Sequence, residues 1–212
     1  MTAEPELPGL PAHAFDKQDA APDAEFYAQP RFVTHIDDRA IAAVTGLYRE
    51  LFPAGGTVLD LMGSWVAHLP DDVAYAQVIG HGMNAEELAA NPRYDRWFVR
   101  DLNAEPTLPL DSASVDAVGL CVSIQYLERP VSILREIRRV LKPGGVLAVS
   151  FSNRCFPTKA VLIWQAIETG EHPHLVALYL ANAGFAAVAA RTLIPPGPGG
   201  DPLWAVTGRA PG

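Results

Sequence analysis

Apolar segments alternate with helical segments through the middle of this chain, and this alternation limits what it can fold into. Between residues 57 and 151, apolar runs such as T-V-L-D-L-M and V-L-A-V-S-F are separated by helical segments such as S-I-L-R-E-I-R-R-V-L. Runs that are apolar at consecutive positions must bury both faces, which is typical of a parallel sheet covered by helices on each side. The sequence therefore predicts an α/β fold with a mostly parallel sheet.

Two further strands are predicted near the end of the chain, at about 187–193 and 203–208. A short segment rich in proline and glycine, P-P-G-P-G-G-D-P, joins them. A connection this short suits antiparallel neighbours, because a parallel crossover needs about a dozen residues or more. We therefore expect one antiparallel strand, preceded by helices at about 159–167 and 172–183.

The beginning of the chain differs from this pattern. The first 25 residues hold six acidic side chains against Lys17 alone, and their prolines and weak apolar periodicity predict a flexible acidic tail that is mobile or draped over the surface. From Phe32 to Leu51, apolar residues recur at three- and four-residue steps, which predicts an amphipathic helix opened by Pro30. We divide the chain into the tail (1–25), an N-terminal helix or lid (26–56) and one domain (57–209).

Composition excludes several classes of function. The chain has 16 Lys and Arg against 24 Asp and Glu, without a basic stripe, and nucleic-acid binding depends on such cations. Cys121 and Cys155 have no C-x-x-C spacing and the histidines have no H-x-x-x-H spacing, so we predict reduced core thiols and no metal site. The start of the chain lacks a signal-peptide pattern, and no apolar run approaches the roughly 20 residues of a membrane span. We expect a cytoplasmic protein with neither nucleic acid nor membrane as partner.

At this point the order of elements resembles a known family. The segment L-P-L-D-S-A-S-V-D-A-V-G-L-C-V-S-I-Q-Y-L, followed by L-R-E-I-R-R-V-L-K-P-G-G-V-L-A-V-S-F, resembles the central half of class I S-adenosylmethionine-dependent methyltransferases of the small-molecule type (type 11). The resemblance runs from about 58 to 208. It implies a Rossmann-like, seven-stranded, mostly parallel sheet with one antiparallel strand and helices on both faces. It also implies S-adenosylmethionine as cofactor and a small-molecule acceptor.

The cofactor loop departs from the family pattern. Ligands of an open parallel sheet bind beyond the carboxyl ends of its strands. There the family reads acid-x-Gly-x-Gly-x-Gly, because glycine lets the backbone approach the cofactor. This chain reads D-L-M-G-S-W-V: Asp60 is kept, while Met62, Ser64 and Val66 stand at the glycine positions and Gly63 lies one place away.

The other cofactor contacts follow from the next two strand ends. Gly82 stands where the family places a ribose-binding acid, Met83 stands at the adenine-packing position, and we add Asn84, whose amide could reach the ribose. Asp101-Leu102 matches the family's adenine site. By resemblance, Arg31 meets the methionine carboxylate; a surface ion pair with Asp38 is the alternative. The predicted cofactor-binding residues are Arg31, Asp60, Gly63, Ser64, Trp65, Gly82, Met83, Asn84, Asp101 and Leu102.

Methyl transfer from a sulfonium needs an in-line nucleophile and exclusion of water, so positioning carries most of the rate and a general base is optional. If the acceptor is an oxygen or a thiol, the candidate bases are His35, His68 and Tyr126; for each histidine a packing role is the alternative. Arg31 and His35 are four residues apart, which on the predicted helix places them on one face. The predicted acceptor-binding residues are Tyr27, Gln125, Tyr126, Asn153 and Arg154.

Two other functions remain open. A methyltransferase fold without a working cofactor site could act as a binding or scaffold module, since a fold alone does not decide function. A nicotinamide-dependent oxidoreductase would need G-x-G-x-x-G after the first strand and an acid at the end of the second, and the sequence has neither.

Overall fold

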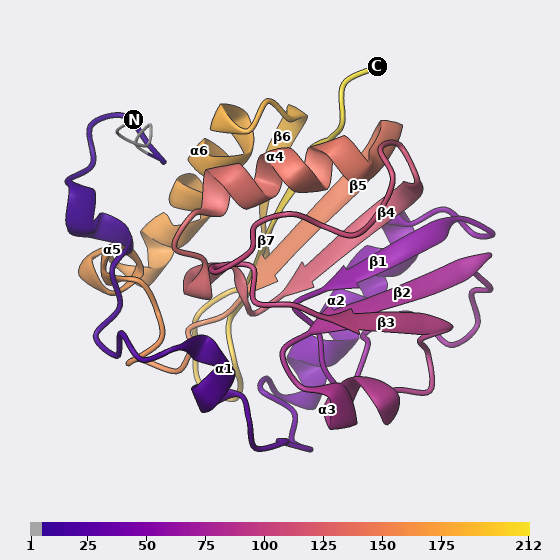
Figure 1. Ribbon diagram of the computed structural model, residues 1–212, viewed down its shortest axis with the longest axis horizontal. Helices are drawn as coiled ribbons and strands as arrows, with labels where there is room; N and C mark the ends of the chain where they lie inside the picture. Colours follow the sequence, from indigo (N-terminus) through magenta and orange to yellow (C-terminus); the bar gives the residue numbers. More distant parts are fainter. Residues whose placement is uncertain (1–5) are drawn as a thin grey trace.

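The computed structural model describes residues 6–212, which form a seven-stranded sheet with helices on both faces (Figure 1). The strand order is β3-β2-β1-β4-β5-β7-β6. Strand β7 runs antiparallel to both of its neighbours, and the other pairings are parallel. This confirms the predicted sheet with one antiparallel strand. The strands are β1 (Thr57–Leu61), β2 (Gln77–Gly82), β3 (Arg96–Val99), β4 (Val115–Cys121), β5 (Leu141–Phe151), β6 (Ala186–Ile194) and β7 (Leu203–Arg209).

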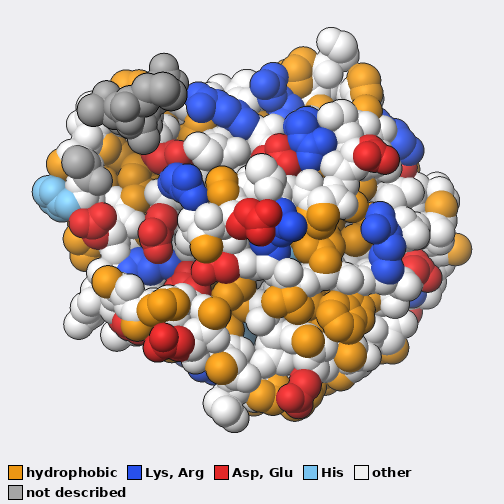
Figure 2. All heavy atoms as spheres, in the orientation of Figure 1, with side chains coloured by type: hydrophobic (Ala, Val, Ile, Leu, Met, Phe, Trp, Pro, Cys, Tyr) orange, Lys and Arg blue, Asp and Glu red, His pale blue; other side chains and the backbone are white. Residues whose placement is uncertain are grey.

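The helices bury one apolar cluster on each face of the sheet. Residues of α4 and α6 pack into one cluster and residues of α2 pack into the other. Within residues 6–212, no helix combines the length and the apolar character needed to cross a bilayer. On the face in Figure 2, basic and acidic side chains are interspersed. The helices are η1 (Ala12–Phe15), α1 (Asp23–Phe26), α2 (Asp38–Leu51), α3 (Ala85–Ala89), η2 (Ile124–Tyr126), α4 (Pro130–Val140), α5 (Leu162–Ala166), η3 (Thr169–Glu171) and α6 (His172–Asn182).

Helix α2 begins later than the sequence pattern indicates. The prediction that it opens near Pro30 is wrong, because the helix starts at Asp38. Asp37 is its N-cap, and the Asp37 carboxylate accepts a hydrogen bond from the backbone N–H of Ala40 at 2.8 Å. Residues 27–37 are therefore irregular, and Arg31 and His35 do not share a helix face.

Residues 17–37, called the N-terminal strap below, lie along the body of the domain (Figure 1). Lys17 pairs with Val161 in an isolated antiparallel bridge. Lys159 is fully buried, and its Nζ lies 3.2 Å from a carboxylate oxygen of Asp19 and 3.3 Å from one of Asp23. Part of the predicted tail is thus held against the surface; its first five residues lie outside the described residues.

Candidate active site

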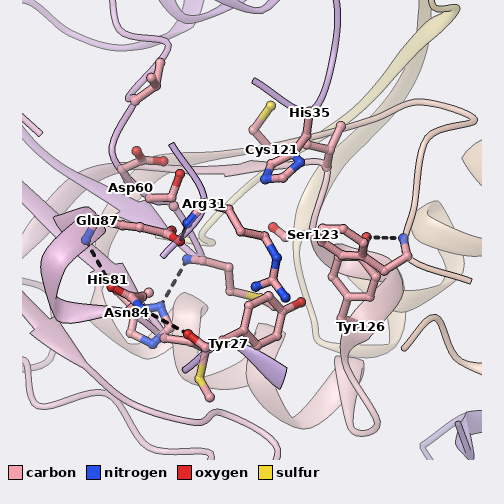
Figure 3. A pocket seen from close by; sticks show the side chains of 18 of the residues that line it. Tyr27, Arg31, His35, Asp60, His81, Asn84, Glu87, Cys121, Ser123 and Tyr126 are labelled. Carbon is pink, nitrogen blue, oxygen red and sulfur yellow. Dashed lines mark hydrogen bonds between the residues drawn. The ribbon is translucent and has the colours of Figure 1, made fainter. Parts of the chain in front are cut away.

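A cavity of about 540 Å³ opens at the carboxyl ends of β1, β2, β4 and β5, and the N-terminal strap forms its remaining wall (Figure 3). This volume lies within the range of small-molecule sites, about 300–1,000 Å³. The position agrees with the expectation that ligands of such a sheet bind beyond its carboxyl edge.

The loop after β1 follows a glycine-like path without glycine at its first position. Met62 has a φ of 57°, in the left-handed region that side chains rarely adopt. The backbone N–H of Met62 donates to Nδ1 of His81 at 3.0 Å, and that of Gly63 donates to the carbonyl oxygen of His81 at 2.7 Å. A Cβ atom on Gly82 would lie 2.4 Å from the Gly63 carbonyl oxygen. The loop is therefore pressed against the end of β2 and holds Met62 in a strained conformation.

Asp60 is a buried carboxylate in the cavity wall. Its Oδ2 accepts a hydrogen bond from the hydroxyl of Tyr94 at 2.7 Å. Burial raises the pKa of Asp60 to about 7, although the Tyr94 hydrogen bond acts to lower it. Tyr94 was missed by the sequence analysis. In the sequence, only Gly80 indicates its position, because a glycine inside a buried strand marks the close approach of another group. A Cβ on Gly80 would lie 2.3 Å from the Tyr94 ring.

Asn84 joins the end of β2 to the N-terminal strap. Its Oδ1 accepts from the backbone N–H groups of Glu86 and Glu87, which caps α3. Its Nδ2 donates to the carbonyl oxygens of Tyr27 at 3.0 Å and Ala28 at 3.2 Å. Both N–H groups that we expected to reach a ribose are thus engaged by the strap.

Glu87 is the second carboxylate described in the cavity wall, and, unlike Asp60, it was not found by the sequence analysis. Its Oε1 accepts from the backbone N–H of Arg31 at 2.6 Å, and burial raises the pKa of its carboxyl group. Its place in the first turn of a helix that follows a strand end was the available signal.

Three of the predicted residues do not line the cavity. The Asp101 carboxylate accepts from the backbone N–H groups of Asn103 and Ala104. The Trp65 indole donates to the carbonyl oxygen of Val33 at 3.1 Å, and the Gln125 amide donates to that of Val122 at 2.9 Å. The predicted residues that do line it are Tyr27, Arg31, His35, Asp60, Gly63, Ser64, His68, Gly82, Met83, Asn84, Leu102, Tyr126, Asn153 and Arg154.

Three aromatic rings lie near the Arg31 guanidinium, and Figure 3 shows the Tyr27 ring beside it. The Arg31 Cζ lies 4.6 Å from the ring centre of Phe26, 5.7 Å from that of Tyr27 and 5.6 Å from that of Phe156. Its Nη2 donates to the carbonyl oxygen of Phe26 at 2.8 Å. These contacts hold the guanidinium at the cavity, and within residues 6–212 Arg31 forms no ion pair with Asp38.

The candidate bases His35, His68 and Tyr126 also line the cavity. The His35 ring lies edge-on to Phe156 at 5.4 Å, and burial lowers the pKa of His35. Burial also lowers the pKa of His68 to about 4. The Tyr126 hydroxyl accepts from the backbone N–H of Phe156 at 2.9 Å, and burial raises the pKa of this phenol to about 12. At neutral pH both histidines are uncharged and Tyr126 keeps its proton.

The turn after β4 contributes groups that the sequence did not single out. Val122 has a φ of 45°, which is unusual for a β-branched residue. Ser123 follows it, is 6% exposed and lines the cavity, and its hydroxyl has no hydrogen-bond partner within residues 6–212. Burial raises the pKa of the Cys121 thiol to about 12. Over the same residues, no three His, Cys, Asp or Glu side chains are grouped as a metal site.

Comparison with known proteins finds similarity to methyltransferases. Residues 62–149 match the sequence model of a family described as a methyltransferase domain. The chain is 33% identical over 127 residues to trans-aconitate 2-methyltransferase of Azoarcus sp. (strain BH72), which covers 56% of this chain and 48% of that protein. It is 30% identical over 131 residues to malonyl-[acyl-carrier protein] O-methyltransferase of Methylococcus capsulatus, which covers 58% of this chain and 47% of that protein. The chain spans about half the length of these relatives.

Solved structures show the same fold at low sequence identity. A chain of the complex between the Haloferax volcanii Trm112 methyltransferase activator and a methyltransferase matches with a TM-score of 0.63 and 21% identity, covering 82% of this chain and 91% of that one. The [4+2]-cyclase SpnF matches with a TM-score of 0.60 and 18% identity, covering 89% of this chain and 90% of that one. The second match carries the name of a different reaction, so activity must be argued from the cavity.

Proposed function

We propose that this chain is a class I, S-adenosylmethionine-dependent methyltransferase, a reading supported by the match of residues 62–149 to a methyltransferase-domain model, and that it transfers a methyl group to a small-molecule acceptor. When bound, S-adenosylmethionine supplies that methyl group on a positively charged sulfonium. The observation that carries the proposal is the wall formed by Asp60 and the Met62 loop at the carboxyl edge of the sheet.

The residues present fit such a cofactor. Asp60 is a buried carboxylate with a single hydrogen-bond donor, so a cationic ligand would stabilise its charged form. Met62 has a left-handed backbone, a conformation that glycine adopts readily, at the first of the positions where the family pattern has glycine. Met83 and Leu102 offer apolar surface for an adenine ring. We propose that Asp60, Gly63, Ser64, Gly82, Met83 and Leu102 hold the cofactor.

The chain's own contribution to the reaction is positioning and exclusion of water. The strap covers one side of the cavity with Tyr27 and Arg31, and Phe156 packs against it. An enclosed wall of this kind holds two reactants in contact and keeps solvent away, which can supply most of the rate of an in-line displacement. His35 and His68 are uncharged at neutral pH, so either can take a proton if the acceptor has one to lose.

A small acceptor is supported by the size of the cavity and by the name of one relative. About 540 Å³ accommodates two small ligands but no folded partner. One curated relative is named for trans-aconitate, which is a small molecule. The other is named for a malonyl group carried on an acyl carrier protein, so only the first name supports a free small acceptor.

Isothermal titration with S-adenosylhomocysteine and with S-adenosylmethionine, with NAD as a control, tests the proposal. We expect both sulfur nucleotides to bind and NAD not to bind. Asp60→Asn should weaken binding by at least about tenfold, as for a hydrogen bond to a charged group. Asp72→Asn removes a surface carboxylate that pairs with Arg49, and is the matched control. A folded wild-type protein that binds neither nucleotide contradicts the proposal and favours a scaffold.

A further inference from the structure

The charged side chains of the cavity are divided between its two sides. Asp60 and Glu87 lie on the side of β1 and α3, whereas Arg31 comes from the strap and Arg154 from the segment after β5 (Figure 3 shows Asp60, Glu87 and Arg31). Arg100, after β3, also lines the cavity, but its guanidinium pairs with Glu105 at 2.9 Å, and Arg154 lies 3.9 Å from Asp201, so Arg31 is the cation of the wall without an ion pair in the described part of the chain. A third carboxylate in the wall, Asp23, is already bound, because its oxygens lie 2.5 Å from Nζ of Lys17 and 3.3 Å from Nζ of Lys159. The side of β1 and α3 suits a cation and the opposite side suits an anion.

Arg31 is held in place but keeps donors free. Glu87 binds its backbone N–H, and its guanidinium donates to the Phe26 carbonyl oxygen at 2.8 Å and to the Gln29 carbonyl oxygen at 3.5 Å. A guanidinium has five N–H groups, so most of them remain for a ligand. Within residues 6–212, no carboxylate lies within ion-pair distance of it. A fixed arginine fork of this kind matches the geometry of a carboxylate.

Ser123 offers a second donor on the same side. Its hydroxyl is buried and has no partner within the described part of the chain, although a buried polar group is normally hydrogen-bonded. The strained backbone of Val122 turns the chain immediately before it, and such strain gathers at functional sites. A ligand oxygen would give this hydroxyl its missing partner.

The Phe156 ring lies near Arg31 and near two of the candidate bases, His35 and Tyr126. The ring lies 5.6 Å from the Arg31 Cζ, 5.4 Å from the His35 ring and 6.0 Å from the Tyr126 ring. Figure 3 shows Ser123, His35 and Tyr126 on one side of Arg31, with Asp60, Glu87 and His81 on the other. Arg31 therefore belongs to the side of the cavity that the proposed cofactor residues leave free.

We propose that this side receives a carboxylate of the methyl acceptor, bound by the Arg31 guanidinium and the Ser123 hydroxyl, so that the acceptor is a carboxylic acid and the product its methyl ester. The inference rests on the proposed function and moves Arg31 from the cofactor to the acceptor. A carboxylate oxygen attacks the methyl carbon, a C–O bond forms, and the C–S bond breaks with its electron pair going to sulfur. The sulfonium becomes a neutral thioether. No proton is released, because a carboxylic acid is already ionised at neutral pH, and no general base is required.

The test is transfer of radioactive methyl from S-adenosylmethionine to carboxylic acids, each paired with its primary amide. Methyl esters release the label as methanol in base, which identifies the product. We expect label in the acids and none in the amides. Arg31→Gln and Ser123→Ala should raise the KM for the best acid, Arg31→Gln by at least about tenfold, and leave S-adenosylhomocysteine affinity within about twofold. Arg31→Lys, which keeps the charge without the fork, should lie between wild type and Arg31→Gln.

Arg191→Gln is the matched control, since Arg191 pairs with Glu50 on the exposed surface. Acids that accept no more label than their amides, including no label in either, overturn the inference. So does an Arg31→Gln protein that loses affinity for S-adenosylhomocysteine while its KM for the acid is unchanged, because Arg31 would then bind the methionine carboxylate. Wild-type protein that fails to bind S-adenosylhomocysteine overturns the proposed function itself, and the titration separates that result from the other two.

Discussion

The cavity has two walls that are built in different ways. The sheet wall, formed by the ends of β1 and β2 with the loops that follow them, depends on close backbone contacts such as that between Gly63 and Gly82. The strap wall, formed by the N-terminal strap and the segments after β4 and β5, depends on side chains that meet from distant parts of the chain. The first wall is set by strand geometry, and the second only by long-range packing.

The two walls also differ in whether their buried charged side chains have partners of opposite charge. On the strap side, the fully buried cation Lys159 is paired with Asp23. On the sheet side, Asp60 is buried without a cation, and burial raises its pKa to about 7. A wall with paired charges is stabilised by its own contacts, whereas the sheet wall gives up stability that a cationic ligand would restore.

The largest expected effect comes from removing the buried cation of the strap wall. Lys159→Met should lower the free energy of unfolding by about 3 kcal/mol, because it leaves buried carboxylate and carbonyl groups without their partner. Urea denaturation measures it. The control Arg191→Met, which removes one half of an exposed ion pair, should cost less than about 1 kcal/mol. Equal effects in the two variants would mean that the ionic contacts do not hold the strap.

Asp60→Asn tests the opposite wall through pH. The pKa of Asp60 is about 7 in the folded protein and 3.8 in the reference state. Between these two pH values the carboxyl group is ionised in the unfolded state but still protonated in the folded state. The contribution of Asp60 to stability is therefore fully present below pH 4 and is lost as the pH rises through 7. Without ligand, the stability of Asp60→Asn relative to wild type should therefore increase between pH 4 and 7, by about 4 kcal/mol.

Urea denaturation of both proteins across this range measures the difference. The lowered pKa values of His68 and His81 act in the opposite direction, but they are common to both proteins and cancel. Tyr94→Phe removes the hydrogen bond that lowers the pKa of Asp60. In this variant, the pH range over which Asp60 changes the free energy of unfolding should extend above 7. A difference between wild type and Asp60→Asn that does not vary with pH would show that Asp60 titrates normally.

Asn84 connects the two walls, and two substitutions separate its roles. Asn84→Asp keeps the oxygen that caps α3 but cannot donate to the Tyr27 and Ala28 carbonyl oxygens. Asn84→Ala loses both roles and should cost about 1–2 kcal/mol. Hydrogen exchange of residues 27–31 should increase in both variants, and exchange of α3 in Asn84→Ala alone. Unchanged exchange in the strap of Asn84→Asp would remove this link between the walls.

The smallest effect concerns the strained loop. Because a side chain at a φ of 57° is unfavourable and glycine is not, Met62→Gly should be more stable than Met62→Ala by about 1 kcal/mol. The alanine variant is the matched control, since both remove the thioether and only alanine keeps the Cβ. Thermal unfolding measures the difference. Alanine equal to or better than glycine would argue against backbone strain at this position.

Sequence reasoning reached most of the sheet wall. The apolar runs and the Pro/Gly segment predicted the strands, and the strand ends placed Asp60, Gly63 and Gly82 at the cavity. It did not find Tyr94 or Glu87, because the hydrogen-bond partner that gives each its place is tens of residues away in the chain. It also placed Asp101 at the cavity, whereas the Asp101 carboxylate caps its own turn.

The strap wall was the less predictable one. The apolar spacing after Phe32 suggested a helix through this segment. Instead, Asp37 is the N-cap of α2, so the helix begins only at Asp38, and the Glu87 carboxylate accepts a hydrogen bond from the backbone N–H of Arg31. Residues 27–37 are therefore placed by tertiary hydrogen bonds that no local periodicity reports.

By itself, the sequence determined the sheet, its antiparallel strand and the edge of the sheet where the cavity opens. Consecutive apolar positions and short connections are local features of a sequence, and the carboxyl edge follows from the direction of the strands. Only the tertiary structure decided which charges line the cavity, which of them are already paired and where Arg31 points. Those properties depend on distances between side chains far apart in the chain, and only packing sets such distances.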